Sequence, residues 1–182
     1  GMLIASMVLF IVYKNRQEKA RLLKRAQRDA LTGLYNKKTT QELIERSLEE
    51  GEAESCNGLL IMDVDYFKQV NDTYGHIVGD KVLKTFGHLL ARQFREHDIA
   101  GRIGGDEFLV LIPGITENLF QSMIRSMLVD MAKSSVHLAL GSVWVDDCTG
   151  KVEKSLSEAD ARMYEDKRAY YAKNRQLDRR RH

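Results

Sequence analysis

The residues Gly104-Gly105-Asp106-Glu107-Phe108 constrain the fold of this chain more than any other stretch. Two adjacent glycines allow a tight turn, and the apolar segments Ile99 to Ile103 and Phe108 to Ile112 flank them. This pattern predicts a hairpin that carries carboxylates at its tip. Carboxylates beside exposed backbone amides suit a magnesium ion that itself holds phosphates. Taken alone, the pentapeptide is equally typical of a solvated hairpin tip, because Gly-Gly-Asp turns are common.

Length and composition bound the remaining possibilities. The 182 residues allow one domain with a sizeable core, plus extensions. The net charge is only +2 and no long basic face emerges, which argues against a nucleic-acid partner. Cys56 and Cys148 lack metal-site spacing and are too few for a disulfide framework, so a reducing compartment is expected.

The N-terminus is apolar from Leu3 to Tyr13, about half of the roughly 20 residues that span a membrane. It lacks the basic start and the cleavage site of a signal peptide. Basic residues follow at once between Lys14 and Arg28, and such residues mark the cytoplasmic side of a span. We therefore expect residues 1–13 to end a transmembrane helix and 14–28 to form a helical linker. The alternative is a helix end that is buried or packed on a partner.

Hydrophobic periodicity predicts the other elements. Helices are expected at Lys37–Glu50, Tyr66–Tyr74, Val78–Phe94, Glu117–Ala132 and Ser155–Lys173, and further strands at Gly58–Asp63 and Val136–Val145. Ser155 or Ser157 is expected to cap the last helix. A hairpin between helical crossovers implies an α/β (α+β) domain over residues 29–175, with a mixed, mainly antiparallel sheet flanked by helices. Residues 176–182 form a basic tail.

Asp63 ends a buried strand. If that strand neighbours the hairpin, Asp63 converges with Asp106 or Glu107. Three carboxylates around one point repel strongly unless a cation lies among them, and magnesium shared with a triphosphate is the natural occupant. The alternative is an acid at a strand end in solvent.

The segment that follows Asp63 is rich in polar side chains, namely Lys68, Asn71, Asp72, His76 and Asp80. An amide and a carboxylate together can read a guanine edge, and a lysine can neutralise charge that develops on phosphate. Each residue also has a simpler interpretation: a turn at Asn71, a helix cap at Asp80, or a surface histidine.

Three ordered motifs carry a resemblance to a known family. They are Asp-x-Asp-x-Phe-Lys-x-x-Asn-Asp-x-x-Gly-His-x-x-Gly-Asp from Asp63 to Asp80, Arg-Ile-Gly-Gly-Asp-Glu-Phe from Arg102, and Asp-x-x-Met-Tyr-x-x-Lys ending at Lys167. Together with Asp29-Ala-Leu-Thr-Gly-Leu, they span about three-quarters of the chain. The chain resembles the GGDEF-domain family, the diguanylate cyclases.

The resemblance implies a five-stranded mixed sheet like the palm of nucleotidyl cyclases and polymerases. It also implies that two domains in a homodimer each bind one GTP and condense the pair into cyclic di-GMP, with magnesium or manganese as cofactor. Joined to the N-terminal apolar run, it implies a bacterial inner-membrane protein with a cytoplasmic catalytic domain.

The resemblance also implies roles for individual residues. The metal ligands are Asp63, the Val64 carbonyl, Asp106 and Glu107, and Glu107 is alternatively the general base. Lys68 stabilises the transition state. The substrate contacts are Phe67, Asn71, His76, Asp80, Gly104, Gly105 and Lys167, with Asn71 and Asp80 facing guanine. Asp80 favours strict use of GTP.

Two further features concern regulation and phosphate binding. Arg95-Glu-His-Asp98 resembles the family's Arg-x-x-Asp site, where the product binds and inhibits, and Arg125 is a candidate second arginine. The chain departs from the family at Tyr170-Tyr171-Ala172, where a Gly-Arg-Asn segment usually contacts the triphosphate. Lys173 or Arg175 could replace that arginine. Two other functions stay open: a binding module without turnover, and a related enzyme that uses another nucleotide.

Overall fold

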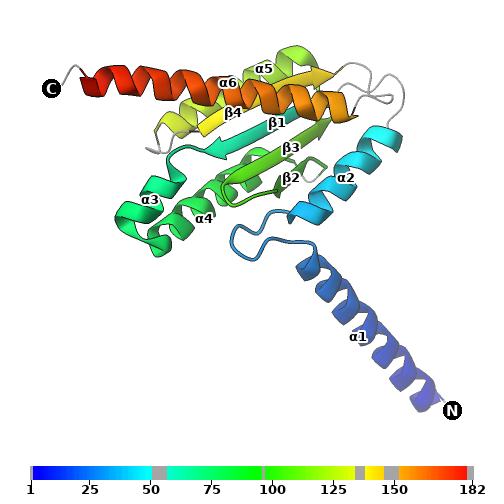
Figure 1. Cartoon of the computed structure of the whole chain (residues 1–182). Coiled ribbons are helices and arrows are strands. Elements are labelled where there is room, and N and C mark those ends of the chain that lie inside the picture. The colour runs from blue at the N-terminus through cyan, green and yellow to red at the C-terminus, as the bar shows by residue number, and fades with distance from the viewer. Residues whose placement is uncertain (1, 51–56, 96, 134–137, 146–151, 180–182) are drawn as a thin grey trace.

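A computed structural model describes residues 2–50, 57–95, 97–133, 138–145 and 152–179 of the chain (Figure 1). The elements in chain order are α1 (Met2–Ala26), α2 (Lys37–Glu50), β1 (Asn57–Val64), α3 (Phe67–Tyr74), α4 (His76–Gln93), β2 (Ile99–Arg102), β3 (Glu107–Pro113), α5 (Glu117–Ala132), β4 (Leu138–Val145) and α6 (Val152–Arg179). The cysteines, the tail from residue 180 and the expected start of the last strand lie outside these ranges.

The described strands form one four-stranded sheet in the order β2-β3-β1-β4, and every neighbouring pair is antiparallel. The expected fifth strand and mixed directions are not found in this part of the chain. The nearest approach is Tyr35, which forms an isolated parallel bridge with Gly101. Tyr35 exchanges backbone hydrogen bonds with Ala100 and Arg102, but α2 begins at Lys37 and leaves no length for a strand.

Helices cover both faces of the sheet. On one face, side chains of β1 and β3 pack against Leu83, Phe86 and Leu90 of α4 and against the buried residues of α5. On the other face, they pack against Ile44 of α2 and Met163 of α6. All eight residues of β1 are buried, which explains why this central strand is apolar without alternation.

The last helix lies very close to the sheet edge. A side chain at Gly141 of β4 would collide with the backbone carbonyl of Ala159 in α6, so only glycine permits this approach. The helix begins at Val152, about one turn before the expected start, and Ser155 is buried inside it. The prediction that Ser155 or Ser157 caps α6 is therefore wrong, because the helix starts before both serines and Ser155 packs inside the fold.

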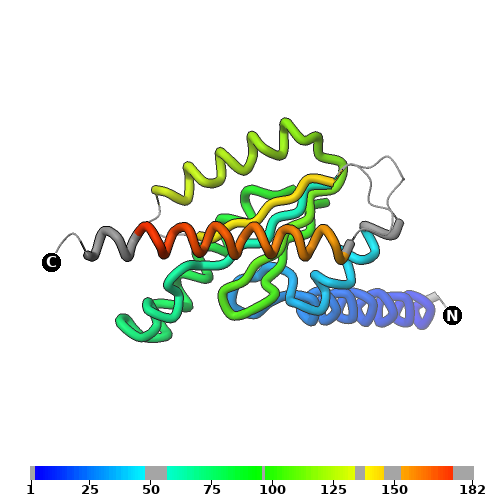
Figure 2. Tube along the Cα trace, turned by 45° about the horizontal axis from the view of Figure 1, so that its top comes forward, coloured from blue at the N-terminus to red at the C-terminus, as the bar shows by residue number. Residues whose placement is uncertain are grey.

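The N-terminal helix α1 projects away from the sheet, and the two ends of the chain lie at opposite ends of the molecule (Figures 1 and 2). Its apolar residues from Leu3 to Tyr13 are exposed. At its other end, Asn36 donates hydrogen bonds to the carbonyls of Ala26 and Gln27. None of the helices in the described ranges is long and apolar enough to cross a membrane.

Candidate active site

Acidic residues gather where β1 ends and β3 begins. The antiparallel register pairs Asp63 with Glu107, and the Val64 amide donates to the Asp106 carbonyl at 3.1 Å. Residues that pair directly across strands share a face, so the two acids at 63 and 107 lie on one side of this edge. The condition set by the sequence, that the strand ending in Asp63 neighbours the hairpin, is therefore met.

Lys167 of α6 lies against this edge. Its Nζ is 2.8 Å from Oδ1 of Asp63, whose carboxylate is buried. Burial alone would lower the pKa of Lys167, but the hydrogen bond and the charge of Asp63 outweigh it, so this pKa is raised. The ion pair holds Lys167 in its charged form and fixes the middle of α6 beside the acidic edge.

The carboxyl group of Asp106 has a raised pKa. Burial is the main cause and repulsion by Asp63 adds to it, while Lys167 and Arg102 oppose the change. The carboxylates of Asp63 and Asp106 thus lie close enough to repel each other at a partly buried site. Within the described ranges, no three acidic, histidine or cysteine side chains cluster closely enough to hold a metal ion, so the expected meeting of three carboxylates is not found.

Glu107 turns back over the hairpin. A side chain at Gly104 would meet that of Glu107, so this glycine gives room for the acid, whereas Gly105 faces open space. The amides of Ile103 and Gly104 both donate to the Glu107 carbonyl. Neither glycine has a positive φ, so packing rather than an unusual backbone angle explains Gly104.

A contact that the sequence did not predict anchors the hairpin. Arg102 donates to the Gly105 carbonyl at 3.1 and 2.6 Å and also to the carboxylate of Asp29 at 3.2 Å. Asp29 accepts from the amide and hydroxyl of Thr32 at 2.9 and 2.7 Å. The turn after α1 therefore supports the loop that carries Asp106. In the sequence, the only sign of this contact was that the motifs beginning at Asp29 and Arg102 belong to the same resemblance.

The contacts with Thr32 and Arg102 change the pKa of Asp29. Burial favours its neutral form, but the hydrogen bonds from Thr32 and the nearby Arg102 charge outweigh it, so the pKa of Asp29 is lowered. The charged form of this carboxyl is the one that the folded chain stabilises.

The candidate guanine-binding residues lie away from the acidic edge. Asn71 is on α3 and Asp80 on α4, and these two helices pack side by side (Figure 1). Asn71 is half-buried, and its Oδ1 has no hydrogen-bond partner among the described residues. A side chain at Gly79 would collide with that oxygen and would lie 3.2 Å from the ring of Phe67. Gly79, which sequence reasoning passed over, thus makes room for Asn71.

The charged members of this group are more open. Lys68, His76 and Asp80 are exposed, and no described residue forms an ion pair with any of them. The structure therefore separates the candidate residues into a buried acidic edge and an open α3–α4 surface, joined by the short loop after β1.

That loop is unusual. Tyr66 has φ of 58°, in the left-handed region that aromatic residues rarely adopt. Its ring lies 4.8 Å from that of Tyr171 and 5.7 Å from that of Tyr170, between ring centres. Burial and the charge of Asp65 raise the pKa of Tyr171. Tyr170 and Tyr171 thus pack α6 onto the loop. Lys173 is exposed, and the Arg175 side chain lies outside the described part.

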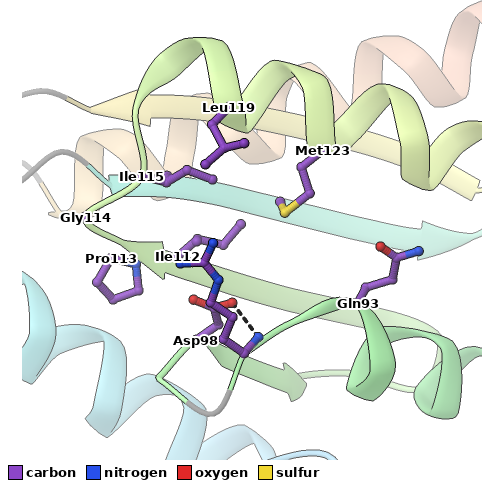
Figure 3. Close-up of a pocket in the computed structure, with 9 residues that line it drawn as sticks. Gln93, Asp98, Ile112, Pro113, Gly114, Ile115, Leu119 and Met123 are labelled. Carbon is purple, nitrogen blue, oxygen red and sulfur yellow. Dashed lines mark hydrogen bonds between the residues drawn. The ribbon is translucent and has the colours of Figure 1, made fainter.

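The candidate inhibitory residues lie at the opposite end of the β2–β3 hairpin. The Arg95 amide donates to Oδ2 of Asp98 at 2.7 Å, and the Asp98 amide donates back to the Arg95 carbonyl. Asp98 borders a cavity of about 250 Å³ whose far wall includes Leu119 and Met123 of α5 (Figure 3). Arg125 donates to the Ser122 hydroxyl and is not among the residues that line this cavity.

Sequence comparison now identifies the family. The family "Diguanylate cyclase, GGDEF domain" matches residues 26–173. The chain belongs to this family. It is 32% identical over 148 residues to diguanylate cyclase DgcS of Shewanella oneidensis, a match that covers 80% of this chain and 49% of DgcS. Against the probable diguanylate cyclase DgcC of Escherichia coli, identity is 29% over 165 residues, covering 86% of this chain and 44% of DgcC.

A solved structure agrees. The GGDEF domain of DgcB from Caulobacter crescentus, in complex with c-di-GMP, superposes with a TM-score of 0.71 at 26% identity, covering 79% of this chain and 91% of that one. The α/β fold is therefore that of a GGDEF domain. The chain spans about half, or less, of the length of these curated relatives.

Proposed function

We propose that this chain is the catalytic part of a diguanylate cyclase, which condenses two GTP molecules into cyclic di-GMP and two pyrophosphates. The observation that carries the proposal is the acidic edge, where buried Asp63, Asp106 with its raised pKa, and Lys167 meet. Family membership supports the reaction type, and the family is typically metal-dependent.

The acidic edge fits a magnesium ion, with manganese as the alternative. Asp63, Asp106 and the Val64 carbonyl offer hard oxygen donors, and a magnesium site needs only one or two carboxylates when phosphates complete it. The two carboxylates repel each other, and a cation would remove that repulsion. When bound, the ion supplies polarisation of phosphate oxygens.

The reaction needs two domains. The 3′-hydroxyl oxygen of each GTP forms a bond to the α-phosphorus of the other GTP. The bond from that phosphorus to the oxygen shared with the β-phosphate breaks, and pyrophosphate leaves. Because each domain holds one GTP, we propose a homodimer. Glu107 takes the hydroxyl proton or binds a second ion. Lys68 and Lys167 offset the negative charge of the phosphates, which is catalysis by positioning and charge.

Guanine selection falls to α3 and α4. Asn71 offers a donor and an acceptor, Asp80 accepts from the base's N–H groups, and the unpartnered Oδ1 of Asn71 supports this role. Phe67 and His76 lie in the same helix pair, and the backbone of Gly104 and Gly105 is assigned to the phosphates. GTP is thus preferred over ATP.

Regulation and location complete the proposal. Arg95 and Asp98 bind the product and inhibit turnover. The exposed apolar residues from Leu3 to Tyr13 continue a membrane anchor, and residues 14–28 link it to the domain at 29–175. The protein is then placed at a bacterial inner membrane with this domain in the cytoplasm.

A second candidate is a module that binds GTP or cyclic di-GMP without turnover. The packing of Tyr170 and Tyr171 where a phosphate-contacting arginine is usual favours it. Calorimetry that detects tight nucleotide binding in a sample without turnover would support this candidate.

The test is an assay on the chain held as a dimer by a fused coiled coil, incubated with magnesium and either GTP or ATP. Mass spectrometry identifies the products. We expect cyclic di-GMP from GTP and no cyclic product from ATP. No cyclic dinucleotide from a demonstrably dimeric sample would refute the cyclase, and equal use of ATP would refute the guanine assignment.

A further inference from the structure

A groove lies where the linker helix meets the domain. It is lined by Lys24 of α1, by Arg28 and Tyr35 in the turn that follows α1, and by Arg95 and Asp98 beyond α4. Its volume is about 460 Å³, within the range of pockets that bind small molecules. We call this the linker groove. The last turn of α1 therefore forms one wall of a space whose other wall holds the candidate inhibitory pair.

The linker groove concentrates positive charge. Three cationic side chains line it, from Lys24, Arg28 and Arg95, against the single carboxylate of Asp98. The net charge is +2, which equals in magnitude the charge on the two phosphodiesters of a cyclic dinucleotide. None of the three cations forms an ion pair with a described residue. An anion in the groove would relieve their mutual repulsion.

Arg28 is held in place before any ligand arrives. Its guanidinium lies over the Tyr35 ring at 3.9 Å from the ring centre, and one nitrogen donates to the Gly33 carbonyl at 3.4 Å. The remaining N–H groups of the guanidinium have no acceptor among the described residues. A planar guanidinium fixed in this way is suited to bind a phosphate through two parallel hydrogen bonds.

Arg95 and Asp98 also border the cavity on the α5 side, where Leu119 and Met123 provide apolar contacts (Figure 3). The pair therefore lies between a charged space and an apolar one. A ligand that combines phosphates with flat bases matches this pairing, because the phosphates suit the charged side and a base suits the apolar side.

We propose that the linker groove binds phosphodiester groups of cyclic di-GMP, and that Lys24 of α1 and Arg28, just beyond the end of α1, are ligands of the inhibitory site together with Arg95. The inference rests on the product-inhibited cyclase proposed above. It gives the product a direct contact with the linker helix, so that a bound product ties α1 to the catalytic domain.

Calorimetric titration of the 182-residue chain with cyclic di-GMP tests this. Lys24→Ala should weaken binding about fivefold, the upper range for one exposed ion pair, and Lys24→Glu should weaken it further. Combining Lys24→Ala with Arg28→Ala should reduce the salt dependence of binding. Arg25→Ala is the matched control, since Arg25 directly follows Lys24 on the same helix and lines a different surface; it should bind like the parent chain.

The outcomes separate the two proposals. If Arg95→Ala abolishes binding while the Lys24 variants bind normally, the linker groove is refuted and the inhibitory site survives. If the parent chain binds no cyclic di-GMP, both assignments fail, while cyclase turnover is judged by its own assay. Equal weakening by Arg25→Ala, or equal loss of GTP binding in the Lys24 variants, would indicate general charge attraction and overturn the inference. Lys24 is exposed and contacts no described partner, so its variants fold independently of the result.

Discussion

Gly79→Ala should separate folding from guanine recognition. The new methyl group would collide with Oδ1 of Asn71, the end of a short side chain that can rotate away. It would also lie 3.2 Å from the Phe67 ring, which needs only a small shift. The substitution therefore displaces the residue assigned to guanine while leaving the backbone of α4 in place.

Three free-energy terms decide whether Gly79→Ala stabilises or destabilises the fold. Alanine is favoured over glycine in a helix by about 1 kcal/mol. Moving the unpartnered Oδ1 of Asn71 out of its buried position relieves a cost of about 1–3 kcal/mol. Overpacking against Phe67 costs about 1–3 kcal/mol. The last two terms offset each other, so the helix preference remains and the free energy of unfolding should rise by about 1 kcal/mol.

Function should change far more. Losing two hydrogen bonds from Asn71 to guanine removes about 1–3 kcal/mol, and each 1.4 kcal/mol is about tenfold in affinity. We expect the GTP KM of Gly79→Ala to rise roughly tenfold. Urea unfolding and steady-state kinetics on the dimeric sample measure both quantities.

Gly87→Ala is the matched control in the same helix. Its methyl group would lie 3.0 Å from the backbone carbonyl of Thr32 and 2.7 Å from its Cβ, neither of which can rotate away. This variant should lose stability, whereas Gly79→Ala should not. An unchanged KM in Gly79→Ala would refute the placement of guanine beside Asn71.

Three further predictions concern stability. Because the folded-state pKa of Asp29 is lowered, this residue stabilises the fold above its ordinary pKa of 3.8, and the stabilisation is lost as pH falls through the folded value. In urea melts between pH 7 and 3, Asp29→Asn should therefore make the free energy of unfolding fall less steeply at low pH. An unaltered slope would contradict this. Gly141→Ala should lower the melting temperature by several degrees, because its methyl group meets the Ala159 backbone; calorimetry with no shift would rule out the close approach of α6. Tyr171→Leu removes the ring contact with Tyr66 and should cost about 1 kcal/mol, whereas Tyr171→Phe should cost less; equal losses in the two variants would refute a ring-packing role.

Much of the fold follows from hydrophobic periodicity. The predicted bounds of Lys37–Glu50 and Glu117–Ala132 are confirmed, because each helix has an apolar stripe. The start of α6 could not be predicted, since burial of Ser155 against the sheet is a tertiary effect. A fifth strand is absent from the described residues for a similar reason, because the length available at Tyr35 depends on where α2 begins.

The candidate site, like the fold, could be predicted only in part. The sequence predicted a buried strand that ends in Asp63 but left open whether this strand neighbours the hairpin, and the register that pairs Asp63 with Glu107 answers that question. The pairing of Asp63 with Lys167 joins residues 104 positions apart, and only the family resemblance brought Lys167 into the set. The left-handed backbone of Tyr66 has no signal in the sequence, because it is held by rings from a helix at the other end of the chain.

The most direct test of the central claim is the turnover of labelled GTP by the dimeric chain, comparing Asp106→Asn with Asp130→Asn. Asp130 is an exposed aspartate of α5 that pairs only with Lys133 and Gln93 among the described residues. We predict one cyclic di-GMP and two pyrophosphates for every two GTP in the parent chain and in Asp130→Asn, and no product in Asp106→Asn. Full turnover by Asp106→Asn would contradict the assignment of the acidic edge as the catalytic centre.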